Sequence, residues 1–176
     1  NIVMSDWWEY DPATNSWSQK ADYIGNNGNG NYGVIKMTIG NFGYLAGGTL
    51  GDQMLYKYDP TLNLWTPVVM CPIVPGNRAA FAIGDKGYYV SGSIVYEFDS
   101  VTEIWSTKNP APFTASVWNS AFVLNGKGYI KNGTSIYEYK ASIDSWTPRA
   151  AFPGLAIRAS VALTHDGKGY IVSGYG

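Results

Sequence analysis

Two arginines and an asparagine stand where the chain could bind an anionic ligand. Arg78 and Arg158 each precede a short apolar segment, and Asn119 precedes a third segment of the same kind. A guanidinium group presents paired N–H donors that match a carboxylate, so such residues could form a polar ring around a ligand. The alternative is that these side chains cap strand ends and find local hydrogen-bond partners, as buried polar groups usually do.

Five aromatic residues outside the regular pattern of the chain could add stacking to such a site. They are Tyr23, Tyr32, Phe113, Trp118 and Phe152. Aromatic rings stack on sugars and on peptide side chains, although packing against the protein itself is the alternative for each of them. Trp118 is the strongest candidate because Asn119 follows it directly.

Groups for acid–base or metal chemistry are few. Asp22 and Asp52 are the carboxylates expected in the same region as the arginines. The one histidine, His165, lies in "THDGKG", which is typical of a solvated turn. The one cysteine, Cys71, excludes an internal disulfide and a thiolate metal cluster. We therefore expect no catalytic residue, no metal and no cofactor.

The composition favours turn-rich β structure and excludes several classes of partner. Of the 176 residues, 45% are hydrophobic and 14% charged, and the chain has 14 Tyr and 7 Trp, which suit half-buried strands. The formal charge of −1 argues against nucleic acid and anionic membranes as partners. No apolar run approaches the roughly 20 residues that would span a bilayer.

One pattern recurs four times along the chain. "LYKYDPTLNLW" (55–65) resembles "WWEYDPATNSW" (7–17), "VYEFDSVTEIW" (95–105) and "IYEYKASIDSW" (136–146). The tryptophans Trp17, Trp65, Trp105 and Trp146 stand 48, 40 and 41 residues apart, and a Gly-Tyr pair recurs with almost the same period. Two independent markers with one period indicate a repeat architecture.

Each repeat divides into four short strands, and no segment has the spacing of an amphipathic helix. "AAFAI" (79–83), "YYVSG" (88–92), "IVYEF" (94–98) and "EIWST" (103–107) form one such set. A lone sheet with two apolar faces must be covered on both, and radial packing around an axis satisfies this requirement. The sequence predicts an all-β fold, a β-propeller of four-stranded antiparallel blades.

The landmarks resemble the kelch repeat over essentially the whole chain. "GYLAGG" (43–48) and "LYKYDPTLNLW" (55–65) carry the diglycine, the aromatic residue and the tryptophan of that family. The resemblance is specific for fold and weak for function. The diglycine is kept only at Gly47-Gly48, and its equivalents are Ser91-Gly92, Asn132-Gly133 and Ser173-Gly174.

The two ends of the chain complement each other as parts of a blade. The chain begins at a third strand and stops after a second one, so the terminal strands could share one blade and remove two exposed edges. We expect one domain, 1–176, with blade units at about 1–20 with 158–176, 32–67, 78–108 and 118–148. A segment of a larger ring is the alternative to a closed ring of four blades, and the oligomeric state is left open.

The links between strands predict which end of the propeller carries function. Links such as 84–87 and "DPTLN" (59–63) are short and repetitive, and Asp11, Asp59 and Asp99 are expected to cap turns rather than bind metal. The links at the opposite end are longer and differ between blades, as functional loops often do. The glycine-rich link 25–33 fits a lid or a linker rather than a phosphate loop. The candidate ligand-binding residues on that side are Arg78, Arg158, Asn119, Trp118, Tyr32 and Asp52.

The favoured function is non-catalytic recognition of a protein or glycan at this loop end. The resemblance implies ligand contacts at the channel mouth, and similarity to repeats of bacterial exported proteins favours an extracellular or cell-surface location. Some kelch propellers are sugar-acid isomerases, and the paired arginines Arg78 and Arg158 with a carboxylate, Asp22 or Asp52, would suit that chemistry. A purely structural subunit of a surface assembly is the third hypothesis.

Overall fold

The computed structural model describes residues 3–48, 50–76, 78–115, 118–172 and 174. Ser173, and the outermost residues of the predicted terminal blade at 1–2 and 175–176, lie outside the described residues. The described chain is almost entirely β, with two single-turn 3-10 helices, η1 (Asn26–Gly28) and η2 (Ala141–Ile143). Among these residues, no helix is long and apolar enough to cross a membrane.

Three complete blades form the centre of the fold, each with its four strands hydrogen-bonded antiparallel in chain order. Blade A consists of β3 (Ile35–Ile39), β4 (Phe42–Ala46), β5 (Met54–Asp59) and β6 (Leu64–Met70). Blade B consists of β7 (Ala80–Ile83), β8 (Lys86–Ser91), β9 (Ile94–Asp99) and β10 (Ile104–Lys108). Blade C consists of β11 (Ser120–Leu124), β12 (Lys127–Asn132), β13 (Ser135–Lys140) and β14 (Ser145–Arg149).

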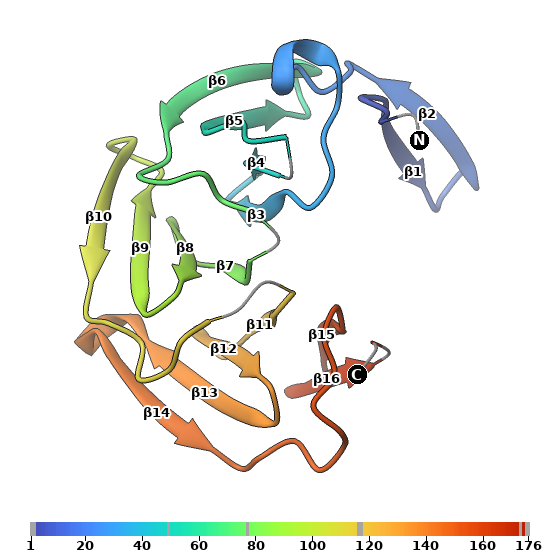
Figure 1. Cartoon of the computed structure of the whole chain (residues 1–176). Coiled ribbons are helices and arrows are strands. Elements are labelled where there is room, and N and C mark those ends of the chain that lie inside the picture. The colour runs from blue at the N-terminus through green and yellow to red at the C-terminus, as the bar shows by residue number, and fades with distance from the viewer. Residues whose placement is uncertain (1–2, 49, 77, 116–117, 173, 175–176) are drawn as a thin grey trace.

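The blades are arranged radially around a central axis (Figure 1). The first strands, β3, β7 and β11, lie toward the centre, and the fourth strands, β6, β10 and β14, lie at the periphery. The prediction of an all-β, propeller-like fold built from four-stranded antiparallel blades is therefore confirmed.

The chain ends form two separate hairpins. The N-terminal hairpin consists of β1 (Trp7–Asp11) and β2 (Ser16–Lys20), and the C-terminal hairpin of β15 (Val161–His165) and β16 (Lys168–Val172). Each is a two-stranded sheet of its own, and Figure 1 shows them apart on the open side of the arc. The predicted shared blade is not confirmed, because each hairpin packs on its neighbouring blade and not on the other hairpin.

The repeated Gly-Tyr pair allows each blade to approach the blade before it. A Cβ atom added at Gly128 would lie 2.2 Å from the ring of Phe81 in blade B, and one at Gly169 would lie 2.4 Å from the ring of Phe122 in blade C. Both distances are shorter than any tolerated contact, so only glycine lets these aromatic rings pack directly on the strand behind them. The Gly-Tyr landmark is thus a requirement of packing between blades.

The repeated tryptophans complete the same interfaces. Trp65 is 4% exposed, and its ring centroid lies 5.4 Å from that of Trp7 in the N-terminal hairpin. Its indole Nε1–H donates to the carbonyl oxygen of Ala21 at 3.1 Å. Trp105 and Trp146 pack against the two larger core clusters, but their indole nitrogens have no hydrogen-bond partner among the described residues. These three tryptophans therefore pack between neighbouring parts of the fold, whereas Trp17 is 66% exposed.

The turns between third and fourth strands are capped as expected. Asp11, Asp59 and Asp99 each accept a backbone N–H from two residues later at 2.8 Å. The same turns also join blades, which the sequence did not indicate. Asn63 accepts the backbone N–H of Ala21 at 2.8 Å, and Asp144 accepts that of Asn109 at 3.0 Å. A turn of one blade thereby holds the chain that leaves the preceding blade.

The burial of these tryptophans leads to a stability prediction. Trp65→Ala should lower the free energy of unfolding by about 3–5 kcal/mol, because it removes a large side chain from a packed interface. Trp17→Ala, at the equivalent position, separates two states: it should cost no more than about 0.5 kcal/mol if the indole stays exposed, and a loss close to that of Trp65→Ala if the terminal hairpins pair and cover it. Denaturant titration followed by fluorescence measures both. Equal losses would show that Trp17 is also buried in solution.

Candidate functional site

The strand registers identify which residues surround the mouth of the central channel. The tyrosine of each Gly-Tyr pair lies opposite an equivalent residue of the first strand; these tyrosines are Tyr44, Tyr88, Tyr129 and Tyr170. We call the residue three positions before that partner the mouth position of the repeat. The four mouth residues are Val34, Arg78, Asn119 and Ser160. Arg78 and Asn119 were predicted correctly as equivalents. Arg158 was not, because it lies two residues before the mouth position and Ser160 occupies it.

Two adjoining hollows mark the channel and its mouth. The first, about 220 Å³, is lined by the starts of all four first strands and includes Lys36 and Arg78. The second, about 270 Å³, is lined by Arg78, Trp118, Asn119 and residues from the chain entering β3 and β15. The structure thus brings together three of the predicted site residues. Arg158 and Tyr32 are exposed and line neither hollow.

The charges of these hollows are all of one sign. Lys36 and Arg78 are cationic, and none of the described residues lining either hollow is acidic. The Nε of Arg78 is fully buried and has no hydrogen-bond partner among the described residues. A buried donor without a partner loses its hydration at a cost of about 1–3 kcal/mol. The mouth is therefore suited to an anion or another strong acceptor.

Hydrogen bonds hold one wall of the mouth on blade C. Ser120 and Ser160 share a hydrogen bond of 2.7 Å, and the backbone N–H of Ala159 donates to the carbonyl oxygen of Trp118 at 3.0 Å. Asn119 donates from its side-chain amide to Asn132 Oδ1 at 3.1 Å. The approach to β15 is thereby fixed on the blade that carries Trp118.

Behind this wall lies a buried lysine. Lys131 is 2% exposed, at a position where the other complete blades carry Ala46 and Val90. Its Nζ donates to the carbonyl oxygen of Ile157 at 2.8 Å and lies 5.2 Å from the centroid of the Phe152 ring. Burial lowers the pKa of this amine. Lys131 anchors the chain segment that leads to the mouth.

Trp118 adopts a backbone conformation that tryptophan seldom takes. Its φ is 69°, and the equivalent residues Gly33 and Ala159 have φ of 70° and 52°. A left-handed residue therefore precedes the mouth position in each of these three repeats. Glycine adopts this region freely, whereas a bulky side chain there is strained. Strain of this kind occurs at functional sites more often than elsewhere, and the indole is 38% exposed.

Asp52 belongs to a different place. It lines a separate hollow of about 230 Å³ with Asn26, Asn27 and Tyr56. Its carboxylate accepts the backbone N–H of Asn26 at 2.7 Å and that of Met54 at 3.0 Å. Burial, followed by the charge of Asp52, raises the pKa of Tyr56 to about 12. The structural task of this carboxylate is to hold the glycine-rich link 25–33 against blade A.

Three of the predicted stacking residues are packed inside the protein. The ring centroid of Tyr23 lies 5.0 Å from that of Trp65, and Phe113 lies 5.3 Å from Trp146. Phe152 lies beneath Lys131. The packing alternative therefore holds for these residues, and Tyr23 and Phe113 form a further repeated contact with the tryptophan of the next blade.

The remaining reactive groups lie apart from the mouth. The side chain of His165 is 74% exposed at the end of β15, and its Nε2 lies 3.2 Å from Asp166 Oδ2. Cys71 is 1% exposed, and burial raises the pKa of its thiol to about 12. Within the described residues, no group of three His, Cys, Asp or Glu side chains could hold a metal ion.

Comparison with known proteins supports the fold and leaves the function open. No protein-family model and no curated protein matches this chain. Among solved structures, the structure of YjhT aligns with a TM-score of 0.76 at 15% sequence identity. The alignment covers 90% of this chain and 63% of the YjhT chain. At this identity the likeness concerns the fold alone.

The strained backbone of Trp118 leads to a second prediction. Trp118→Gly should raise the free energy of unfolding by about 1 kcal/mol, because glycine removes the left-handed strain while an exposed indole contributes little packing. Ala159→Gly should give a similar gain, and Gly33→Ala should lose about 1 kcal/mol. Urea titrations measure all three. A marked loss in Trp118→Gly would mean that the indole is a structural residue.

Proposed function

We propose that this chain is a non-catalytic recognition module built from kelch-type blades. Its ligand is a protein or glycan that presents an anionic group to the channel mouth. The observation that carries the proposal is the unpartnered, buried Nε of Arg78 in a hollow lined by a second cation and by no carboxylate of the described chain.

The chemistry of the mouth supports an anionic group on the ligand. An oxygen anion can accept from Arg78 in a paired geometry that lysine cannot offer. Attraction is strongest where the surrounding protein excludes water, as in a channel walled by strands. Trp118 offers a flat apolar surface beside this point. Arg158 and Tyr32, at the exposed rim, would meet a macromolecular ligand that extends beyond the channel.

The alternative of a sugar-acid isomerase receives less support. That hypothesis joined the paired arginines to Asp22 or Asp52, but Asp52 lines another hollow, and Asp22 and Arg158 lie outside the mouth hollows. The described mouth residues include no carboxylate that could move a proton. Recognition requires only the donors and the aromatic surface that are present. An extracellular or cell-surface location remains part of this proposal.

We keep the shared terminal blade within the proposal. In the complete blades the second strand pairs with the third. β16 corresponds to a second strand and β1 to a third strand, so their free edges could pair with each other. The faces that a ring would cover are exposed and apolar: Trp8, Tyr10 and Trp17 on one hairpin, and Val161, Leu163, Tyr170 and Val172 on the other. Pairing β16 with β1 would complete a fourth blade.

Two arginine variants test the recognition site. Glucuronate serves as a glycan probe and N-acetylaspartate as a protein-like probe, with glucose as the neutral control. We expect at least one anion to shift the Nε–H resonance of Arg78 in NMR titrations. Arg78→Met should weaken that binding about tenfold or more, because a hydrogen bond to a charged group is lost.

Arg158→Met is the matched control and should bind as the natural chain does. Equal weakening in both variants, or no binding of either anion, would contradict the proposal. The same NMR spectra report any conversion of glucuronate, and turnover would favour the isomerase instead.

A cysteine pair tests the shared blade. The register places Tyr44 opposite Lys57, Tyr88 opposite Glu97 and Tyr129 opposite Glu138. Extending it to the termini places Tyr170 opposite Glu9. Glu9→Cys with Tyr170→Cys should form a disulfide within one chain on oxidation, because cross-strand partners meet the required Cα spacing. Mass spectrometry of the oxidised monomer measures this. A disulfide only between chains, or none, would reject the shared blade.

A further inference from the structure

The largest of the four hollows described lies away from the mouth. It has a volume of about 380 Å³ and lies between blades A and B, at the end of the propeller where the short turns gather. Phe42, Tyr44 and Lys57 line it from blade A, and Asp85, Ser100 and Val101 line it from blade B. Its size falls in the range of small-molecule sites. The sequence pattern had indicated that this end is structural.

Blades B and C show what normally fills this place. In blade C, Lys127 Nζ lies 3.0 Å from Glu138, and the Tyr129 hydroxyl donates to Glu138 at 2.7 Å. A lysine of the second strand and a tyrosine hydroxyl thus meet one glutamate of the third strand.

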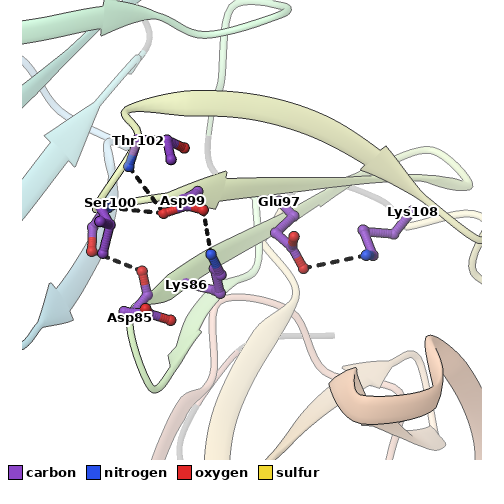
Figure 2. A network of polar contacts seen from close by, with 8 residues as sticks. Asp85, Lys86, Glu97, Asp99, Ser100, Thr102 and Lys108 are labelled. Carbon is purple, nitrogen blue, oxygen red and sulfur yellow. Dashed lines mark hydrogen bonds and ion pairs between the residues drawn. The ribbon is translucent and has the colours of Figure 1, made fainter.

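Blade B has a related network, drawn in Figure 2. Lys86 pairs with Asp99, and Glu97 lies toward Lys108 at 3.6 Å. Burial, followed by a hydrogen bond to Glu97, raises the pKa of Tyr88. In this blade the lysine of the second strand pairs with Asp99 and the glutamate of the third strand lies toward Lys108, so both charged groups have partners of opposite charge.

Blade A departs from this arrangement at both paired positions. The register aligns Phe42 with Lys86 and Lys127, because each pairs with the last residue of its first strand. It likewise aligns Lys57 with Glu97 and Glu138. In blade A, phenylalanine therefore stands in the place of the lysine, and lysine stands in the place of the glutamate. The ammonium group of Lys57 lies 5.2 Å from the centroid of the Phe42 ring.

These exchanges leave a hydroxyl without its acceptor. Tyr44 is 3% exposed, and none of the described residues forms a hydrogen bond with its hydroxyl. The nearest carboxylate to Lys57 is that of Glu103 in blade B, at 3.9 Å and half exposed. Exposed pairs at this distance contribute little. The Tyr44 hydroxyl and one cation therefore line this hollow beside an apolar floor.

We propose that this hollow, the Tyr44 pocket, binds a small carboxylic acid that carries an aromatic or branched aliphatic group. The ligand carboxylate takes the place of the missing glutamate, accepts from the Tyr44 hydroxyl and pairs with Lys57. The apolar group lies on Phe42, Ile39 and Val101. The site is independent of the channel mouth and of the function proposed there.

Phenylacetate and its neutral analogue 2-phenylethanol are the probes for calorimetric titration of the whole chain. Phenylacetate should bind at least about tenfold more tightly than 2-phenylethanol, because only the acid replaces the glutamate. Tyr44→Phe and Lys57→Met should each weaken phenylacetate about tenfold, the range for a hydrogen bond to a charged group. Glu103→Gln should strengthen it by removing a competing carboxylate. Arg78→Met should leave it unchanged.

A repeat-restoring variant guards against a loss of binding caused by misfolding. Phe42→Lys with Lys57→Glu installs in blade A the residues that blades B and C carry. This variant should unfold at no lower temperature than the natural chain and should not bind phenylacetate. Equal affinity for acid and alcohol, no binding at millimolar phenylacetate, or unchanged affinity in Tyr44→Phe and Lys57→Met would overturn the proposal.

Discussion

Coverage of both blade faces is the constraint on which the structure depends. A four-stranded sheet with apolar residues on each side cannot remain exposed to water on either one. Here the cover is always a neighbouring blade. Rings such as Phe81 and Phe122 pack directly on the glycines of the next blade, and Trp65, Trp105 and Trp146 pack against the blade before. Where no neighbour is present, at the two terminal hairpins, the same kinds of side chain are exposed.

The sequence predicted the features that repeat with a constant spacing. Because Trp65, Trp105 and Trp146 and the Gly-Tyr pairs fall at nearly equal intervals, the four-stranded unit could be derived from them. The capping by Asp59 and Asp99 followed from turn chemistry alone. The pairing of the terminal hairpins could not be decided in this way. The position of each strand within the repeat shows that the two hairpins are complementary halves of a blade, but it does not show that they pair.

The sequence failed where spacing varies between repeats. Arg158 looked equivalent to Arg78 because both precede apolar residues, but the pairing of Leu163 with Tyr170 sets the register two residues further on. Tyr23 and Phe113 looked irregular because they follow their tryptophans by six and eight residues. Both nevertheless pack on the tryptophan of the next blade. Local sequence gives the residue types, whereas strand pairing decides which of them are equivalent.

The left-handed residue before three of the four mouth positions has a consequence for how such a protein can change. Gly33, Trp118 and Ala159 share one backbone conformation, so the residues that follow them leave the frame in the same direction. The side chains at these mouth positions can then be exchanged on a common backbone. Valine, asparagine and serine occupy three of the four, and arginine the fourth. New ligand preferences could arise by single substitutions at these mouth positions, without any change to the blades that carry them.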